Sequence, residues 1–269
     1  MRGFPNLIDV IEARKRIQDY IVRTPLHHYE SLSALIGAEI YVKHENHQQL
    51  GSFKVRGAIN VIAQLSTLEK ERGIVAASTG NFGQGIAYAA RRLGVQSHIV
   101  VPADANPSKM DSMRRLGATV LSHGSHFDDA RLWAESLAQS GGYRYVHSAN
   151  EPGLISGVAT YSLEIFEDFP EVDVIIVPIG GGSGACGACI VAKSLSSQVR
   201  VIGVQSANAP GAYWSWKNGD IVHCPMESIA EGLATGSGYA YTQEILREML
   251  DDFILVSDTE IAKSVVLHL

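Results

Sequence analysis

One lysine stands where a helix is expected to begin, in the segment Gly-Ser-Phe-Lys-Val-Arg-Gly-Ala at residues 51–58. Ser52 is a suitable N-cap, and Phe53 and Ala58 lie near helical spacing, which puts Lys54 in the first turn. A partly buried, positive helix start lowers the pKa of an amine and favours its nucleophilic form. Lys54 is therefore a candidate for imine formation with a carbonyl group, and an ordinary surface lysine is the alternative.

A second segment combines glycines with short polar side chains between a predicted strand and a helix expected from Ile86. It reads Ser-Thr-Gly-Asn, and its members are Ser78, Thr79, Gly80 and Asn81. Glycine lets the backbone approach a ligand closely, while the hydroxyl and amide groups lie beside helix-start N–H donors. The segment suits a carboxylate or phenolate oxygen, although a plain strand-to-helix turn is the alternative.

A third segment is the run Gly180, Gly181, Gly182, Ser183 and Gly184, which follows a predicted strand and precedes a helix expected from Ala185. Consecutive glycines at a helix N-terminus expose several backbone N–H groups, which favour a phosphate. Residues 182–187 also match the G-x-G-x-x-G pattern of dinucleotide sites. That pattern needs an acidic residue after the next strand, and Gln205 and Ser206 there count against it.

Strands and helices alternate along the chain and are expected to position these segments. Short β-branched runs predict strands at residues 73–77, 98–102, 119–122, 143–147, 174–178 and 199–205. Amphipathic stretches predict helices at residues 106–116, 128–138 and 154–169, and Ser257 with Glu260 forms a capping box before another helix. This alternation predicts an α/β fold with mostly parallel sheets covered on both faces.

Composition favours a globular protein with small ligands. Of 269 residues, 46% are hydrophobic and 19% charged, which is enough to form a core. The net charge of −6 and the lack of a dense basic cluster argue against nucleic-acid or membrane binding. We expect a cytoplasmic protein, because the start of the chain shows no leader pattern and no apolar run approaches the roughly 20 residues of a membrane span.

In family order, these segments resemble the fold-type II pyridoxal-phosphate enzymes, particularly the threonine/serine dehydratase and serine racemase branch. Lys43, Glu45, Gln48 and residues 51–58 are similar to that family's lysine motif. Residues 78–81 resemble its substrate and cofactor loop, and residues 180–184 its phosphate-binding loop. The resemblance extends over nearly the whole chain from Arg23.

The resemblance implies a two-domain fold like that of the tryptophan synthase β chain. The small domain is expected at residues 51–149, inserted into a large cofactor-binding domain of residues 1–50 and 150–269. The expected activity is elimination of the β-hydroxyl of L-threonine, L-serine or a related amino acid, giving an enamine that hydrolyses to a 2-oxo acid and ammonia. A homodimer is also expected.

The resemblance also assigns roles to residues. Lys54 would hold pyridoxal 5'-phosphate as a Schiff base and remove the α-proton, and Phe53 would pack on the cofactor ring. Asn81 would bond to the ring's phenolate oxygen, and Gly180, Gly181, Gly182, Ser183 and Gly184 would hold the phosphate. The substrate carboxylate would bind to Ser78, Thr79, Gly80 and Asn81, with Ser78 and Thr79 also counted as catalytic.

Thr79 leaves a second activity open. Dehydratases of this branch often have alanine at that position and racemases have serine, so a hydroxyl there could return a proton from the face opposite Lys54. An amino-acid racemase is therefore the alternative on the same scaffold. A similar loop occurs in dehydratases linked to hydroxyectoine breakdown, which keeps the natural substrate open.

Other departures bear on metals and on the C-terminal region. Some relatives bind a divalent cation through an acidic pair, and Gln205 and Gly211 stand at the matching positions, so we expect no metal. A zinc site at Cys186, Cys189, His223 and Cys224 is a weaker interpretation than core packing, and His44 with His47 lacks a third ligand. Relatives continue past the helix near Thr259, so a catalytically weak cofactor-binding protein is a further alternative.

Overall fold

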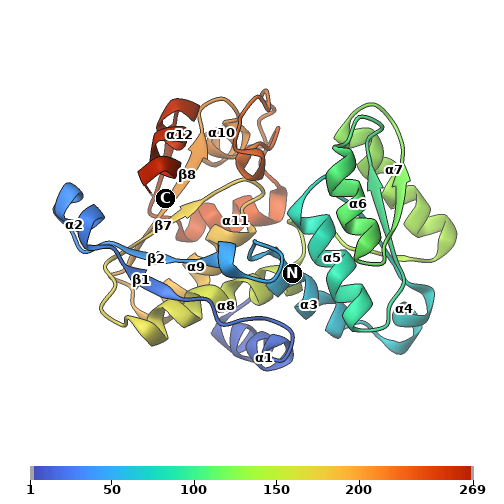
Figure 1. Ribbon diagram of the computed structural model, residues 1–269, viewed down its shortest axis with the longest axis horizontal. Helices are drawn as coiled ribbons and strands as arrows, with labels where there is room; N and C mark the ends of the chain where they lie inside the picture. Colours follow the sequence, from blue (N-terminus) through green and yellow to red (C-terminus); the bar gives the residue numbers. More distant parts are fainter. Residues whose placement is uncertain (1–2, 268–269) are drawn as a thin grey trace.

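The computed structural model describes residues 3–267, whose elements gather into two lobes, each built on a parallel sheet (Figure 1). The expectations about a leader and about the C-terminal region involve Met1 and Leu269, which lie outside the described residues. We call the lobes the four-stranded lobe and the three-stranded lobe.

The four-stranded lobe is a parallel sheet covered by helices on both faces. Its elements are β3 Ile74–Ala77, β4 Ser97–Val101, β5 Thr119–Ser122, β6 Arg144–Tyr145, α4 Thr67–Arg72, α5 Asn81–Arg92, α6 Pro107–Arg115 and α7 Phe127–Gly141, with strand order β5-β4-β3-β6. Successive side chains of a strand point to opposite faces. Ile74 and Ala76 of β3 thus pack in the core that holds α5, while Val75 and Ala77 pack with α7.

The three-stranded lobe has strand order β7-β8-β9, again with parallel neighbours. Its elements are β7 Val174–Pro178, β8 Arg200–Ser206, β9 Asp252–Val256, α1 Leu7–Ile17, α8 Pro152–Asp168, α9 Ser183–Leu195, α10 Gly211–Asn218, α11 Ala240–Met249, α12 Asp258–Leu267 and the 3-10 helix η2 Glu231–Leu233. Its apolar core includes both buried cysteines of α9, Cys186 and Cys189.

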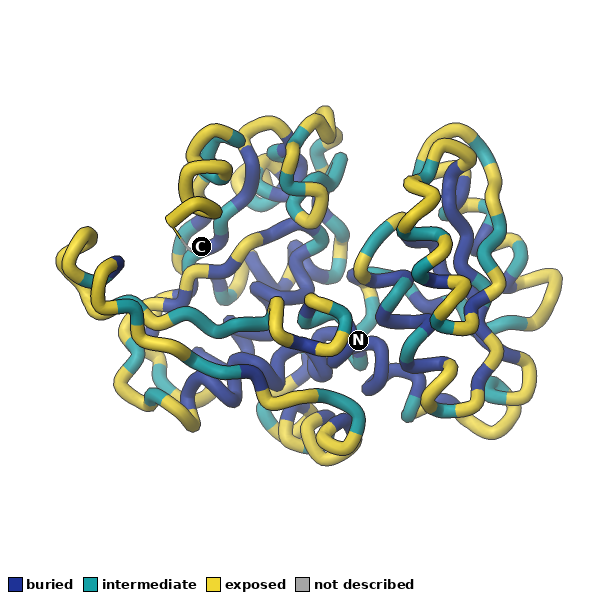
Figure 2. The backbone as a smooth tube through the Cα atoms, viewed as in Figure 1, coloured by how far each residue is buried: buried dark blue, intermediate teal, exposed yellow. Residues whose placement is uncertain are grey.

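Helix α8 joins the two candidate helix starts, because α3 (Lys54–Ala63) and α9 both pack against it. Residues 154–166 of α8 are all buried, as the dark tube below the three-stranded sheet shows (Figure 2). Glycines permit this close packing: a Cβ at Gly57 of α3 would lie 2.7 Å from the carbonyl oxygen of Leu154, and one at Gly187 of α9 would lie 2.8 Å from Ala159 Cα. Lys54 and the glycine run are thus fixed on one scaffold.

An antiparallel hairpin precedes α3. Strands β1 Leu26–His28 and β2 Tyr41–Lys43 flank helix α2 Glu30–Ile36, which projects from the edge of the molecule (Figure 1). The short 3-10 helix η1 Glu45–His47 then leads to α3. The hairpin therefore carries Lys43, and η1 carries Glu45, toward the start of the lysine helix.

The expected α/β fold with mostly parallel sheets is confirmed. All six predicted strands are present, and Ser257 and Glu260 cap α12 reciprocally at 3.2 and 2.7 Å. Strand β9 and the β1–β2 hairpin were not predicted. Two helix starts were placed too late: α5 begins at Asn81 rather than near Ile86, and α9 at Ser183 rather than Ala185. The domain boundaries at residues 51 and 149 stay a prediction.

Within residues 3–267, no helix is both long enough and apolar enough to cross a membrane.

Candidate active site

Lys54 is the first residue of α3, and its amine reaches the glycine run of the other segment. Its Nζ donates a hydrogen bond of 3.1 Å to Ser183 Oγ at the start of α9. The amine also lies 4.6 Å from the centre of the Phe53 ring. Burial lowers the pKa of Lys54 from 10.5 to about 8, because removal from water disfavours the ammonium. The structure thus brings Phe53, Lys54 and Ser183 together.

Ser52 does not occupy the expected N-cap position. Phe53 stands there without a side-chain cap, and Ser52 Oγ instead accepts the Lys54 N–H at 3.3 Å. The prediction of Ser52 as the N-cap was therefore wrong by one residue, while the prediction that Lys54 lies in the first turn is confirmed. Because the N-cap lies one residue later than expected, Lys54 takes the first position of the helix rather than the second.

The glycine run has little space for larger side chains. A Cβ at Gly180 would lie 2.2 Å from the carbonyl oxygen of Gly232, and one at Gly184 would lie 3.3 Å from the Phe53 ring. Gly182 has a φ of +92°, which side chains rarely adopt. No side chain caps α9, so its first N–H groups are available to a ligand. The run can therefore bind an anion through its backbone.

In the second segment, Ser78 is buried, whereas Thr79 and Asn81 are exposed. Ser78 Oγ accepts the N–H of Gly80 at 3.2 Å and of Gly83 at 2.9 Å. The serine oxygen therefore caps α5, which explains why this helix begins earlier than predicted. Its hydroxyl hydrogen can still donate to a ligand. This segment is linked to Lys54 by the close packing of α5 against α3. A Cβ at Gly85 of α5 would lie only 3.3 Å from the carbonyl oxygen of Lys54.

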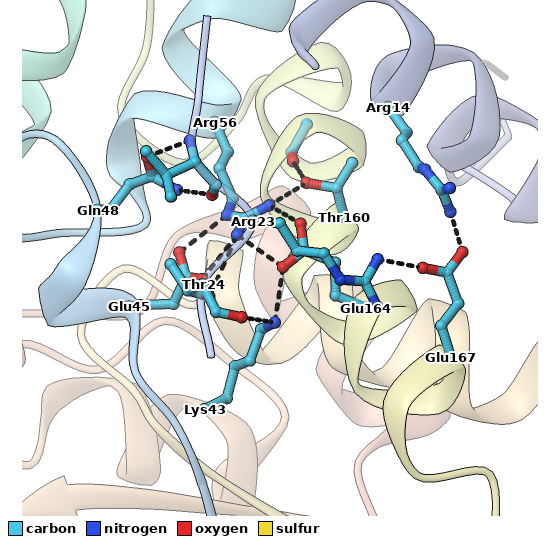
Figure 3. A network of polar contacts seen from close by, with 12 residues as sticks. Arg14, Arg23, Thr24, Lys43, Glu45, Gln48, Arg56, Thr160, Glu164 and Glu167 are labelled. Carbon is cyan, nitrogen blue, oxygen red and sulfur yellow. Dashed lines mark hydrogen bonds and ion pairs between the residues drawn. The ribbon is translucent and has the colours of Figure 1, made fainter. Parts of the chain in front are cut away.

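Two residues after Lys54, Arg56 takes part in a buried ionic cluster that connects α3 to α8 (Figure 3). Arg56 is fully buried and binds Glu45 at 2.8 and 2.9 Å and Glu164 of α8 at 2.7 and 3.0 Å. Lys43 Nζ lies 2.6 Å from Glu164 and donates to the carbonyl oxygen of Thr24 at 2.7 Å. We define the cluster as Lys43, Glu45, Arg56 and Glu164, in which two cations face two carboxylates. At its edge Lys43 also lies 3.9 Å from Asp168, whose own charge is paired with Arg23.

Sequence patterns did not reveal this cluster as a unit. The resemblance singled out Lys43 and Glu45, but Glu164 carried no motif, because its partner Arg56 lies 108 residues earlier. Gln48, also part of the motif, lies outside the cluster and holds the backbone of Val22, which precedes β1. Its side-chain amide accepts from Val22 N at 2.9 Å and donates to Val22 O at 2.7 Å.

A loop that contains η2 packs against the glycine run at Gly180. The sequence patterns predict no role for this loop. Thr235 Oγ1 donates to the Gly180 carbonyl oxygen at 3.3 Å. The fully buried Gln205 holds this loop, because its Nε2 donates to Leu233 O at 3.2 Å and its Oε1 accepts the Tyr213 N–H at 3.0 Å. Gln205 thus makes structural hydrogen bonds at a position where the sequence raised the question of a cation.

Four of the remaining metal candidates, Cys186, Cys189, His44 and His47, contact other groups of the protein. Cys186 is buried with its thiol 3.5 Å from the Thr242 carbonyl oxygen, and burial raises its pKa and that of Cys189. The rings of His44 and His47 stack at 4.9 Å. No group of three or more His, Cys, Asp or Glu side chains between residues 3 and 267 is arranged to hold a metal ion.

One cavity of about 380 Å³ lies away from these segments, between the first residues of the chain and the ends of α3 and α8. Its lining includes Arg16, Arg144 and Glu151 but not Lys54 or the glycine run. The candidate site therefore consists of the Lys54 amine, the glycine run and the polar loop of residues 78–81, and this cavity is not part of it.

We expect the amine of Lys54 to titrate near pH 8 in the cofactor-free protein. The unfolded chain binds this proton more tightly, so the contribution of Lys54 to the free energy of unfolding should grow as the pH rises from 8 to 10.5 and be lost as the pH falls. Trace acetylation followed by peptide mass spectrometry measures the titration, with the exposed Lys263 as reference. Labelling of Lys54 that begins only above pH 10 would contradict this expectation.

Comparisons with known proteins agree with this combination of groups. The family described as "Pyridoxal-phosphate dependent enzyme" matches residues 17–268. The chain is 40% identical over 261 residues to an L-threonine ammonia-lyase of Thermotoga maritima, covering 97% of this chain and 65% of that protein. It is 37% identical over 259 residues to the catabolic L-threonine dehydratase TdcB of Escherichia coli, with coverages of 96% and 79%.

Among solved structures, the serine racemase from Dictyostelium discoideum superimposes with a TM-score of 0.90 at 37% identity, covering 97% of this chain and 84% of that one. The chain spans less than two thirds of the length of the Thermotoga relative and a larger share of the other two.

Proposed function

This chain belongs to the family of pyridoxal-phosphate dependent enzymes, and on that premise we propose that it deaminates a β-hydroxy amino acid. The substrates proposed are L-threonine, L-serine or a close analogue. The reaction removes the α-proton and the β-hydroxyl as water, and hydrolysis then returns one water to give a 2-oxo acid and ammonia. The observation that carries the proposal is the hydrogen bond from Lys54 Nζ to Ser183 Oγ at the anion-binding start of α9.

The residues present fit the cofactor. Backbone N–H groups of residues 180–184 would hold the phosphate. The crowding against Gly232 at Gly180 and against Phe53 at Gly184 keeps side chains out of these two positions of the run. Phe53 would cover one face of the ring, and Asn81 would bond to its phenolate oxygen. Pyridoxal phosphate, when bound, supplies the electron sink for negative charge that develops at the substrate Cα.

Lys54 is proposed to take the α-proton at Nζ. Its lowered pKa keeps a useful fraction of the amine unprotonated near neutral pH, which a general base requires. Ser78, Thr79, Gly80 and Asn81 are proposed to bind the substrate carboxylate through hydroxyl, amide and backbone donors. Fixing the carboxylate orients the Cα–H bond toward the lysine, which is how positioning contributes to the rate.

We further propose that residues 51–149 form a small domain, that the protein is a homodimer, and that it acts in the cytoplasm. The four-stranded lobe, whose strands lie between residues 74 and 145, supports the first statement. The exposed apolar side chains Ile176 and Ile254 on the three-stranded sheet are compatible with the second.

A substrate screen tests the function directly. The purified holoenzyme should release equal amounts of 2-oxo acid and ammonia from L-threonine, L-serine or another β-hydroxy amino acid, because one elimination yields one of each. L-Alanine, which has no β-leaving group, is the control and should give neither. Failure to release either product from any β-hydroxy amino acid would remove the proposal.

Racemisation is the second candidate, favoured by the exposed hydroxyl of Thr79 in the substrate loop. A structural neighbour of this chain is a serine racemase. Chiral chromatography of the substrate left in the same screen separates the two activities. Accumulation of the D-enantiomer faster than 2-oxo acid would make racemisation the main reaction.

A further inference from the structure

An ion pair connects the two lobes beside the candidate site. Lys109 of α6, in the four-stranded lobe, pairs with Glu231 of η2, in the three-stranded lobe. The glutamate side chain is 68% exposed and the lysine side chain 29% exposed. An ion pair this open to water is weak, so it can form and break without disturbing either fold.

Glu231 is next in sequence to a residue that contacts the glycine run of residues 180–184. Glu231 immediately precedes Gly232, whose carbonyl oxygen lies against Gly180. The segment on either side is fixed to the three-stranded lobe. Asp258 accepts from Ser228 Oγ at 2.8 Å, and Gln205 donates to Leu233 O at 3.2 Å. The position of the Glu231 backbone is therefore set by the same lobe that holds the phosphate site.

Lys109 is connected to the substrate loop of residues 78–81 through the packing of α6. Lys109 and Met113 are four residues apart on α6 and so lie on one face of that helix. The buried Met113 packs against the first turn of α5, directly after the substrate loop, since a Cβ at Gly83 would lie 2.8 Å from its Cε atom. Gly83 N is in turn held by Ser78 Oγ. Lys109 is thus connected to Ser78 through Met113 and Gly83.

We propose that the Lys109–Glu231 ion pair is a latch that sets the substrate loop at its working distance from the glycine run. Lys109 and Glu231 are positioning residues, since they act through Met113 and Gly232 and not on the reacting atoms. The expected effect of the latch on turnover rests on the proposed function. Its expected effect on the mobility of residues 78–83 and 228–235 does not. Breaking the latch should loosen residues 78–83 and 228–235 while leaving both cores intact.

Three variants test the latch: Lys109→Gln, Glu231→Gln, and the charge exchange Lys109→Glu with Glu231→Lys. Hydrogen exchange of backbone amides in residues 78–83 and 228–235 is followed in the cofactor-free protein, and kcat/KM in the holoenzyme. The matched control is Arg114→Gln, which removes an exposed ion pair with Asp111 inside the same helix. Thermal unfolding of each variant detects any general loss of stability.

Each single variant should exchange about two- to fivefold faster in both segments and lose a similar factor in kcat/KM, mainly through KM. The charge exchange should restore both quantities to within about twofold, because it rebuilds the attraction in reverse. Arg114→Gln should change neither. Unchanged exchange in the single variants, or a charge exchange that restores nothing, overturns the latch. If no β-hydroxy amino acid is turned over, the proposed function fails and the exchange measurement still decides this inference.

Discussion

Replacing Lys54 with alanine should lower turnover of the best β-hydroxy amino acid by about 10³-fold or more while the protein stays folded. The expected size follows from losing the group that moves the proton, for which general base catalysis alone contributes 10²- to 10⁴-fold. The side chain makes one hydrogen bond, to Ser183 Oγ, and its burial disfavours the ammonium. Lys54→Ala therefore removes the proposed proton acceptor but no contact on which the stability of the fold mainly depends.

The same variant should still bind pyridoxal phosphate, because the backbone donors of residues 180–184 remain. Spectroscopic titration measures binding, and borohydride treatment followed by peptide mass spectrometry measures covalent attachment. In the unmodified protein the adduct should be on Lys54, and in the alanine variant it should be absent. Lys263→Ala, on the exposed face of α12, is the matched control and should behave as the parent. An adduct on another lysine in the parent protein would place the site elsewhere.

The elements that carry the site could be predicted because each is encoded over a short stretch of chain. Strand β7 is an apolar run followed, after Ile179, by the glycines at residues 180–182 and then by α9, so this glycine-rich turn is visible in about ten consecutive residues. The position of Lys54 in a first turn follows equally from its neighbours. Periodicity and turn chemistry suffice for such features.

What could not be predicted depends on contacts between distant segments. The η2 loop closes the back of Gly180 from about 50 residues farther along the chain, and no repeat or spacing in either segment reports that contact. The early start of α5 was missed for a local reason. Ser78 Oγ accepts the N–H of Gly83, five residues on, rather than that of the third residue after it, as in a usual N-cap.

The largest expected effect on stability comes from the ionic cluster under the lysine helix. Arg56→Met should lower the free energy of unfolding by about 3–5 kcal/mol, because it leaves the carboxylates of Glu45 and Glu164 with one cation, Lys43, in a buried setting. Methionine keeps much of the volume, so the loss reports charge rather than a cavity. Chemical denaturation of the cofactor-free protein measures it.

A matched pair of variants separates this effect from a general loss of arginine. Arg14→Met removes an arginine that pairs with Glu167 at the surface, where Arg23 also contacts that glutamate at 2.6 Å, so it should cost less than about 1 kcal/mol. Adding Glu45→Gln to Arg56→Met returns the cluster to one cation and one carboxylate, Lys43 and Glu164, which lie 2.6 Å apart. The double variant should therefore be more stable than Arg56→Met alone, since the unpaired charge is gone. If the added Glu45→Gln lowers stability further, the cluster does not act through charge balance, and the remaining hydrogen bond from Thr24 Oγ1 to Glu45, at 2.6 Å, matters more than the charge.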